Sequence, residues 1–249
     1  MVVVEDLDAA AETGRGWPHD QYRIEFACCG LVHAAQHHGP RTSARFTSSR
    51  SYEVPKPMNG VDPDLIRFYD HIEAVDIPVF IGGSIAASVW GEPRATLDID
   101  LVIAATGSDA ERFISAFSPE RYYVPPLEVV RSTFIKASPG GLNVIDSQTT
   151  LKADCYVKGS DELNHYGFAT AVDVELGDLG RTKVASATYV IAMKLRYFAM
   201  SQQDKHLRDI RGIIMGSRDA IDFAMVERSA RVSDTLEFWQ DSLRRSGEE

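Results

Sequence analysis

Cysteine is scarce in this chain, which has three in 249 residues: Cys28, Cys29 and Cys155. Two are adjacent and none forms a Cys-x-x-Cys motif, so the sequence offers neither a disulfide framework nor a zinc site, and we expect a reducing, cytoplasmic location. Long apolar runs are missing as well. The uncharged stretch 77–91 contains Gly and Ser and is too short to span a bilayer, so we expect no membrane association.

An excess of positive charge is also missing, since the formal net charge is −10. This argues against indiscriminate binding of nucleic acid, which depends on neutralising phosphates. The charge is uneven, however, because residues 181–218 contain only two acids, Asp204 and Asp209, against eight basic residues: Arg181, Lys183, Lys194, Arg196, Lys205, Arg208, Arg211 and Arg218. Such a segment is either a site for a phosphate-bearing ligand or a solvated helical face.

The first 57 residues lack sustained periodicity and end in a proline-containing segment, residues 54–57. We predict a poorly ordered extension over 1–57. The first residues lack the basic start of a signal peptide. Met58 begins a segment typical of a domain start, and we hypothesise that the reading frame is over-extended before it.

Two acids mark the strand on which the functional prediction depends. Residues 97–103 are mostly aliphatic and predict a buried strand, on which Asp98 and Asp100 project from one face. Neighbouring carboxylates repel each other unless a cation lies between them. Mg²⁺ is commonly held by one or two carboxylates together with substrate phosphates, so the pair predicts a site for Mg²⁺ or Mn²⁺ with a nucleotide. The alternative is a solvated strand with two surface acids.

A glycine turn precedes this strand. Residues 78–81 predict a short apolar strand and residues 85–90 a helix that ends at Gly91, with Gly82-Gly83 between them. Glycines at such a turn let backbone N–H groups approach a phosphate, and the helix N-terminus favours its negative charge. Ser84 is expected to cap the helix or to contact a phosphate oxygen. The alternative is an ordinary turn with a serine cap.

The combination of Gly82-Gly83-Ser84, a short helix and Arg94-x-Thr96-x-Asp98-x-Asp100 resembles the DNA polymerase β-like nucleotidyltransferase superfamily. It is most similar to the AbiEii/MenT-type branch, whose better understood members are toxins of toxin–antitoxin systems. The resemblance implies that the glycine turn, Ser84, Arg94 and Thr96 bind a nucleotide. It also implies a cognate antitoxin as a partner.

The superfamily carries a third carboxylate on a strand beside the Asp-x-Asp strand, where it helps to bind the metal ions and can act on the attacking hydroxyl. By this resemblance we assign that carboxylate to Asp154, as a third metal ligand. Asp154 has apolar neighbours on an expected central strand, where an unpaired acid is costly. Asp146 is the second candidate, and an acid on an edge strand is the alternative interpretation of Asp154. We predict that the whole region is β-rich, with strands at 129–130, 133–135, 142–145 and 151–157.

Two helices near the C-terminus carry further candidates. In a helix that begins at Ser186, Lys194 shares or borders the apolar stripe, so it either extends to the rim or faces a ligand. The resemblance implies that it faces nucleotide phosphates. In a helix over 205–214, Lys205 and Asp209 lie four residues apart, and they either form a surface ion pair or, as the resemblance implies, contact substrate.

Other helices are expected to have structural roles. Asp62 and Pro63 begin one, and residues 109–117 form another. Residues 219–244 predict one or two closing helices, with Phe238 and Trp239 as core anchors. The expected fold is α/β (α+β): a small mixed β-sheet flanked by helices over 58–180, followed by a helical C-terminal region over 181–249.

The predicted function is Mg²⁺-dependent nucleotide transfer. A nucleoside triphosphate lies against Gly83 and Ser84, the metal bridges its phosphates to Asp98 and Asp100, and Asp154 assists an acceptor hydroxyl that attacks the α-phosphorus. Lys194 neutralises charge on the triphosphate. The resemblance implies an RNA or tRNA 3′ end as the acceptor. The alternatives are a small-molecule, aminoglycoside-like nucleotidyltransferase and a non-catalytic nucleotide-binding or antitoxin-like partner.

Overall fold

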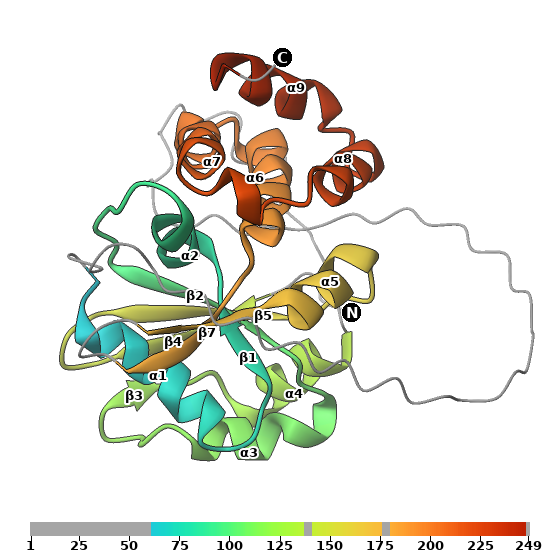
Figure 1. The fold of residues 1–249 in the computed structure, drawn as a ribbon. Coiled ribbons are helices and arrows are strands. Elements are labelled where there is room, and N and C mark those ends of the chain that lie inside the picture. Colours follow the sequence, from blue (N-terminus) through green and yellow to red (C-terminus); the bar gives the residue numbers. More distant parts are fainter. Residues whose placement is uncertain (1–60, 137–140, 176–179, 248–249) are drawn as a thin grey trace, which may run out of the picture.

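The strands of the computed structural model form one mixed sheet with the order β3-β4-β5-β2-β1-β7-β6. The structure describes residues 61–136, 141–175 and 180–247, and the predictions made for 1–57 lie outside them. The strands are β1 Val79–Ile81, β2 Asp98–Ile103, β3 Tyr122–Tyr123, β4 Gly141–Asp146, β5 Lys152–Val157, β6 Val172–Glu175 and β7 Arg181–Val184. The helices are α1 Pro63–Glu73, α2 Gly83–Trp90, α3 Ala110–Ser115, α4 Leu127–Lys136, α5 Glu162–Thr170, α6 Ala187–Ser201, α7 Asp204–Gly216, α8 Phe223–Val232 and α9 Leu236–Arg245. The predicted α/β fold class, with helices after the sheet, is confirmed (Figure 1).

Strand β2 lies inside the sheet, parallel to β5 on one side and antiparallel to β1 on the other. Its Ile99 and Leu101 are fully buried, and α1 packs against this strand. Because side chains alternate along a strand, Asp98 and Asp100 project from the opposite face. Burial of the apolar face therefore fixes the register that presents both acids together.

The C-terminal helices pack against α2, the helix that follows the glycine turn (Figure 1). Helix α6 begins as predicted at Ser186, whose hydroxyl accepts a hydrogen bond from the Tyr189 N–H. Both α6 and α7 contact α2, and the indole N–H of Trp90 donates to the carbonyl of Ala185, 2.7 Å away. These contacts hold the two basic helices against the end of the sheet that carries the acidic pair.

The prediction of strands at 129–130 and 133–135 is wrong, because these residues form α4. The β-branched residues in this segment suggested a strand, but burial follows a helical period. Val130 and Phe134, four residues apart, are buried, while Val129 and Ile135 are exposed. Two prolines precede the helix, and the carbonyl of Pro126 accepts its first backbone hydrogen bonds. Tertiary packing along one helical face thus overrides local β-propensity.

The other predicted helices are present at the expected places in the chain. Asp62 caps α1, accepting a hydrogen bond from the Asp64 N–H, and Pro63 is its first residue. Helix α3, Ala110–Ser115, covers only part of the helix predicted at 109–117. Trp239 of α9 is buried in the core, as predicted. None of the helices in the described residues combines the length and apolarity that crossing a bilayer requires.

Candidate active site

Three carboxylates lie on neighbouring strands at one face of the sheet. Asp100 on β2 is directly opposite Asp154 on β5 in a parallel register, and Asp98 lies two residues before Asp100. Strand β5 is flanked by β4 and β2, so Asp154 is not an acid on an edge strand. Burial, together with the charges of Asp98 and Asp154, raises the pKa of Asp100 to about 6. The charge of Lys194 and the Ser84 N–H act in the opposite direction.

A lysine that the sequence analysis did not single out lies among these carboxylates. The Lys152 ammonium is 3.2 and 3.0 Å from the two carboxylate oxygens of Asp154 and 3.8 Å from Oδ2 of Asp98. Lys152 precedes Asp154 by two residues on β5, so the two side chains share a face. The alternation of Lys152-x-Asp154 along a predicted strand is the signal that would have identified it.

The donor set of this site suits a hard divalent cation, since it consists of carboxylate oxygens. In the described part of the chain no group of three or more His, Cys, Asp or Glu side chains is arranged to hold a metal ion. Asp98 and Asp100 on β2 suit a metal held by two carboxylates together with substrate phosphates, and the role of Asp154 as a third ligand stays a prediction. The Thr96 hydroxyl donates to Oδ1 of Asp98 at 2.7 Å and orients that carboxylate.

The glycine turn is built against Asp100. Gly83 has a φ of +53°, and a Cβ at this position would lie 1.6 Å from Oδ2 of Asp100, so only glycine fits. The Ser84 N–H donates to the Asp100 carboxylate. The expectation that Ser84 caps α2 is wrong, because Gly82 is the N-cap residue and no side chain caps the helix. The Ser84 hydroxyl instead accepts a hydrogen bond from Arg94.

A buried ion pair connects the C-terminal helices to this turn. The Lys194 ammonium lies 2.6 Å from Oδ2 of Asp209, and the two side chains are 6% and 7% exposed. Arg94 bridges the same carboxylate oxygen at 3.4 Å and the Ser84 hydroxyl at 2.5 Å. The predicted surface pair of Lys205 and Asp209 is wrong, since Asp209 points inward to other partners. Lys205 makes no ion pair with any residue that the structure describes.

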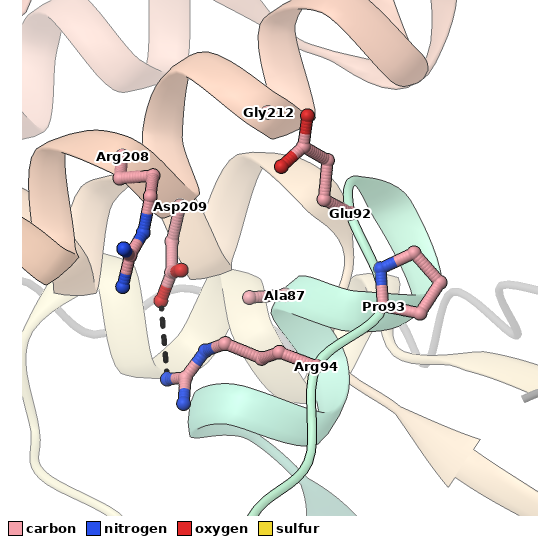
Figure 2. A pocket seen from close by; sticks show the side chains of 7 residues that line it. All are labelled: Ala87, Glu92, Pro93, Arg94, Arg208, Asp209 and Gly212. Carbon is pink, nitrogen blue, oxygen red and sulfur yellow. Dashed lines mark hydrogen bonds and ion pairs between the residues drawn. The ribbon is translucent and has the colours of Figure 1, made fainter. Parts of the chain in front are cut away.

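A pocket of about 260 Å³ lies beside this network, between α7 and the loop that follows α2. Figure 2 shows Arg94 and Arg208 beside Asp209 on one side of the pocket, with Glu92 and Pro93 on the other. Arg94 and Asp209 line both the pocket and the ion-pair network. Arg94 therefore connects the pocket to the glycine turn, because its guanidinium donates to the Ser84 hydroxyl.

Two tyrosines and a histidine surround the site and were not predicted. Burial and the nearby carboxylates raise the pKa values of Tyr156 and Tyr197, so both phenols remain protonated at neutral pH. His206 lies next to Tyr197, with ring centroids 5.9 Å apart. Burial and the charges of Lys194 and Lys205 lower the pKa of His206 to about 4, so its imidazole is neutral at pH 7. No spacing rule brings these residues together in sequence.

Asp146, the second candidate for the third carboxylate, lies on the other face of the sheet. On β4, Asn143 pairs with Asp154, and Asp146 is an odd number of residues away from Asn143. Its buried carboxylate accepts hydrogen bonds from the Arg121 guanidinium and from the Gln148 N–H. Asp146 therefore stabilises the turn between β4 and β5.

Replacing Lys194 with methionine is expected to lower the free energy of unfolding by about 3 kcal/mol, because Asp209 would keep a buried charge without its closest partner. Urea denaturation measures this loss. The double variant Lys194→Met/Asp209→Asn is the matched control and should recover part of the stability, since it removes both charges. A single variant as stable as the wild type would show that water solvates the pair.

No family model matches the chain, and no curated protein matches it. Among solved structures, the antibiotic-resistance factor ANT(2'')-Ia is similar, with 14% identity over 74% of this chain and 96% of its own and a TM-score of 0.48. An antigenic nucleotidyltransferase-like protein from Paracoccidioides brasiliensis has 15% identity over 77% of this chain and 94% of its own, with a TM-score of 0.45.

A CCA-adding enzyme in complex with ATP has 13% identity over 74% of this chain and 51% of its own, with a TM-score of 0.32. The TM-scores of these three structures lie below 0.5.

Proposed function

We propose that this protein is a nucleotidyltransferase that moves a nucleoside monophosphate from a triphosphate to an acceptor hydroxyl. The observation that carries the proposal is the placement of Asp98, Asp100 and Asp154 on neighbouring strands, directly against the turn at Gly83 and Ser84. Carboxylates that hold a metal beside phosphate-binding backbone amides form the recurring arrangement for phosphoryl chemistry.

The residues of the chain have distinct tasks in this mechanism. Asp98 and Asp100 would hold Mg²⁺ or Mn²⁺, which supplies charge neutralisation at the phosphates when bound. The turn at Gly83 and Ser84 places the triphosphate at the start of α2, where the helix dipole favours negative charge. Asp154, opposite Asp100, is positioned to accept a hydrogen bond from the acceptor hydroxyl and to orient it for in-line attack on the α-phosphorus.

The basic groups lie where the leaving group would be. Lys194 is close enough to influence the charge of Asp100, and Arg94 contacts the Ser84 hydroxyl. Arg94 and Arg208 both line the adjoining pocket (Figure 2). We place the distal phosphates of the triphosphate at this end of the site, where fixed cations stabilise the charge that develops on pyrophosphate.

The motif Gly82-Gly83-Ser84 with Arg94-x-Thr96-x-Asp98 supports the further proposal that the enzyme belongs to the AbiEii/MenT-type branch. An RNA 3′ end, such as that of tRNA, is then the acceptor, and a cognate antitoxin is a partner. Expression in a bacterial host tests the toxin role. Growth should stop with the wild type and continue with a variant that lacks both Asp98 and Asp100 carboxylates.

The acceptor is tested by incubating the purified protein with Mg²⁺ and each α-³²P-labelled nucleoside triphosphate, in parallel with total tRNA and with a panel of aminoglycosides. Label on RNA supports the toxin-type reaction and identifies the base preference. Label on an aminoglycoside instead would assign a small-molecule acceptor. Absence of label on every acceptor would favour the non-catalytic nucleotide-binding role.

A further inference from the structure

We propose that Lys152 is an internal counter-cation of the catalytic carboxylates, which the divalent metal displaces when it binds, so that Lys152 sets the metal affinity of the site. The proposal rests on the proposed function, because it requires that Asp98 and Asp100 bind a metal. Lys152 is then a positioning residue: it acts on the metal ligands and does not contact the reacting atoms.

The sheet register places Lys152 among the acids. It is directly opposite Asp98 between β5 and β2, and it is two residues from Asp154 on its own strand. Its ammonium contacts both oxygens of Asp154, at 3.2 and 3.0 Å, and lies 3.8 Å from Asp98. One cation thus bridges carboxylates of two strands, which is the task that a divalent ion would perform in the same place.

The other cations near the site cannot take this role. Lys194 and Arg94 share one oxygen of Asp209, and Lys194 is almost completely buried. The Lys152 side chain is 41% exposed, and among the residues that the structure describes its ion-pair partners are Asp98 and Asp154. Its flexible four-carbon stem lets the ammonium move into solvent without disturbing the core.

Ammonium and metal compete for the same oxygens. An ammonium donates to a carboxylate at about 2.7–2.9 Å, whereas Mg²⁺ binds oxygen at about 2.0–2.1 Å and brings two positive charges. Both cations on one carboxylate edge would repel each other strongly. The metal must therefore displace the Lys152 ammonium from Asp98 at least, and the contact with this lysine lowers the net metal affinity.

The test compares wild type, Lys152→Met and Lys152→Arg. Methionine keeps the length and removes the charge, while arginine keeps the charge. Mn²⁺ binding is measured without substrate by the loss of the free-ion EPR signal, so the result does not depend on catalysis. We expect Lys152→Met to bind Mn²⁺ about tenfold more tightly than the wild type. This is the effect of removing one positive charge that lies about 5 Å from a divalent ion in a hydrated site. Lys152→Arg should stay within about threefold of the wild type, because its charge is retained.

Thermal unfolding gives a second readout. Without metal, Lys152→Met should unfold at a lower temperature than the wild type, because Asp98 and Asp154 lose their shared cation. At saturating Mn²⁺ the difference should vanish, whereas a purely structural ion pair would lower the unfolding temperature equally in both states.

Equal or weaker Mn²⁺ binding by Lys152→Met would overturn the proposal while leaving the metal site intact. The variant Asp98→Asn/Asp100→Asn distinguishes a failure of the metal site from a failure of the role of Lys152 alone. If the wild type binds Mn²⁺ no better than this variant, the metal site fails, and both the proposed function and the role of Lys152 fail with it.

Discussion

Replacing Asp100 with asparagine is expected to lower the rate of nucleotide transfer by about a thousandfold, because the variant loses a carboxylate that would hold the metal at the reacting phosphate. Asparagine has the same shape and can still accept the hydrogen bond from the Ser84 N–H, so the turn keeps its geometry. Single-turnover transfer of α-labelled nucleotide measures the loss. A variant that keeps more than about a tenth of the activity would show that Asp100 does not hold the metal.

The same substitution should stabilise the fold at neutral pH. The folded-state pKa of Asp100 is raised to about 6, above its unfolded value near 3.8. Protonated Asp100 therefore contributes its full share to the free energy of unfolding below about pH 4, and this contribution is lost as the pH rises through about 6. Without metal, Asp100→Asn should exceed the wild type in free energy of unfolding by up to about 3 kcal/mol at pH 8 and by little at pH 4. Urea denaturation in EDTA at both pH values measures this, and a pH-independent difference would contradict it.

Replacing Gly83 with alanine is expected to abolish transfer and to destabilise the fold by at least about 2 kcal/mol, through a positive φ and a steric clash combined. The new Cβ would lie 1.6 Å from Oδ2 of Asp100, so either the turn or the carboxylate must move. Transfer rate and urea denaturation measure both effects.

Gly82→Ala is the matched control for this substitution. A Cβ on Gly82 would meet its nearest atoms, the Asp100 carbonyl oxygen and a Val102 methyl, at 3.7 Å, which is ordinary contact. This variant should stay within about 1 kcal/mol of the wild type and keep most of the activity. Equal behaviour of the two variants would show that the close approach of Gly83 to Asp100 has no functional importance.

The central part of the fold could be predicted from the sequence because its signals are local. Alternation along residues 97–103 placed Asp98 and Asp100 on one face, and the apolar residues around Asp154 indicated an internal strand. The strand, glycine turn and helix over residues 79–90 followed from the order of apolar residues and glycines along the chain. In each case the period of the apolar side chains matches the element that buries them.

The remaining features depend on tertiary contacts. Helix α4 has β-branched residues whose helical period becomes clear only from the burial of Val130 and Phe134. Asp209 pairs with Lys194, fifteen positions away and on a different helix, and not with Lys205, four positions away on its own. Lys152 meets Asp98 only through the parallel register of β5 and β2. No helical or strand period encodes such pairings between elements.

The position of the transferred label tests the central claim most directly. The protein is incubated with Mg²⁺ and total tRNA, with one triphosphate labelled either at the α- or at the γ-phosphorus, alongside Asp98→Asn/Asp100→Asn. Label from the α-position should become covalently attached to RNA, and label from the γ-position should leave as pyrophosphate. The variant should neither attach the α-label nor release labelled pyrophosphate. Attachment of the γ-label, or equal transfer by the variant, would contradict nucleotide transfer by these carboxylates.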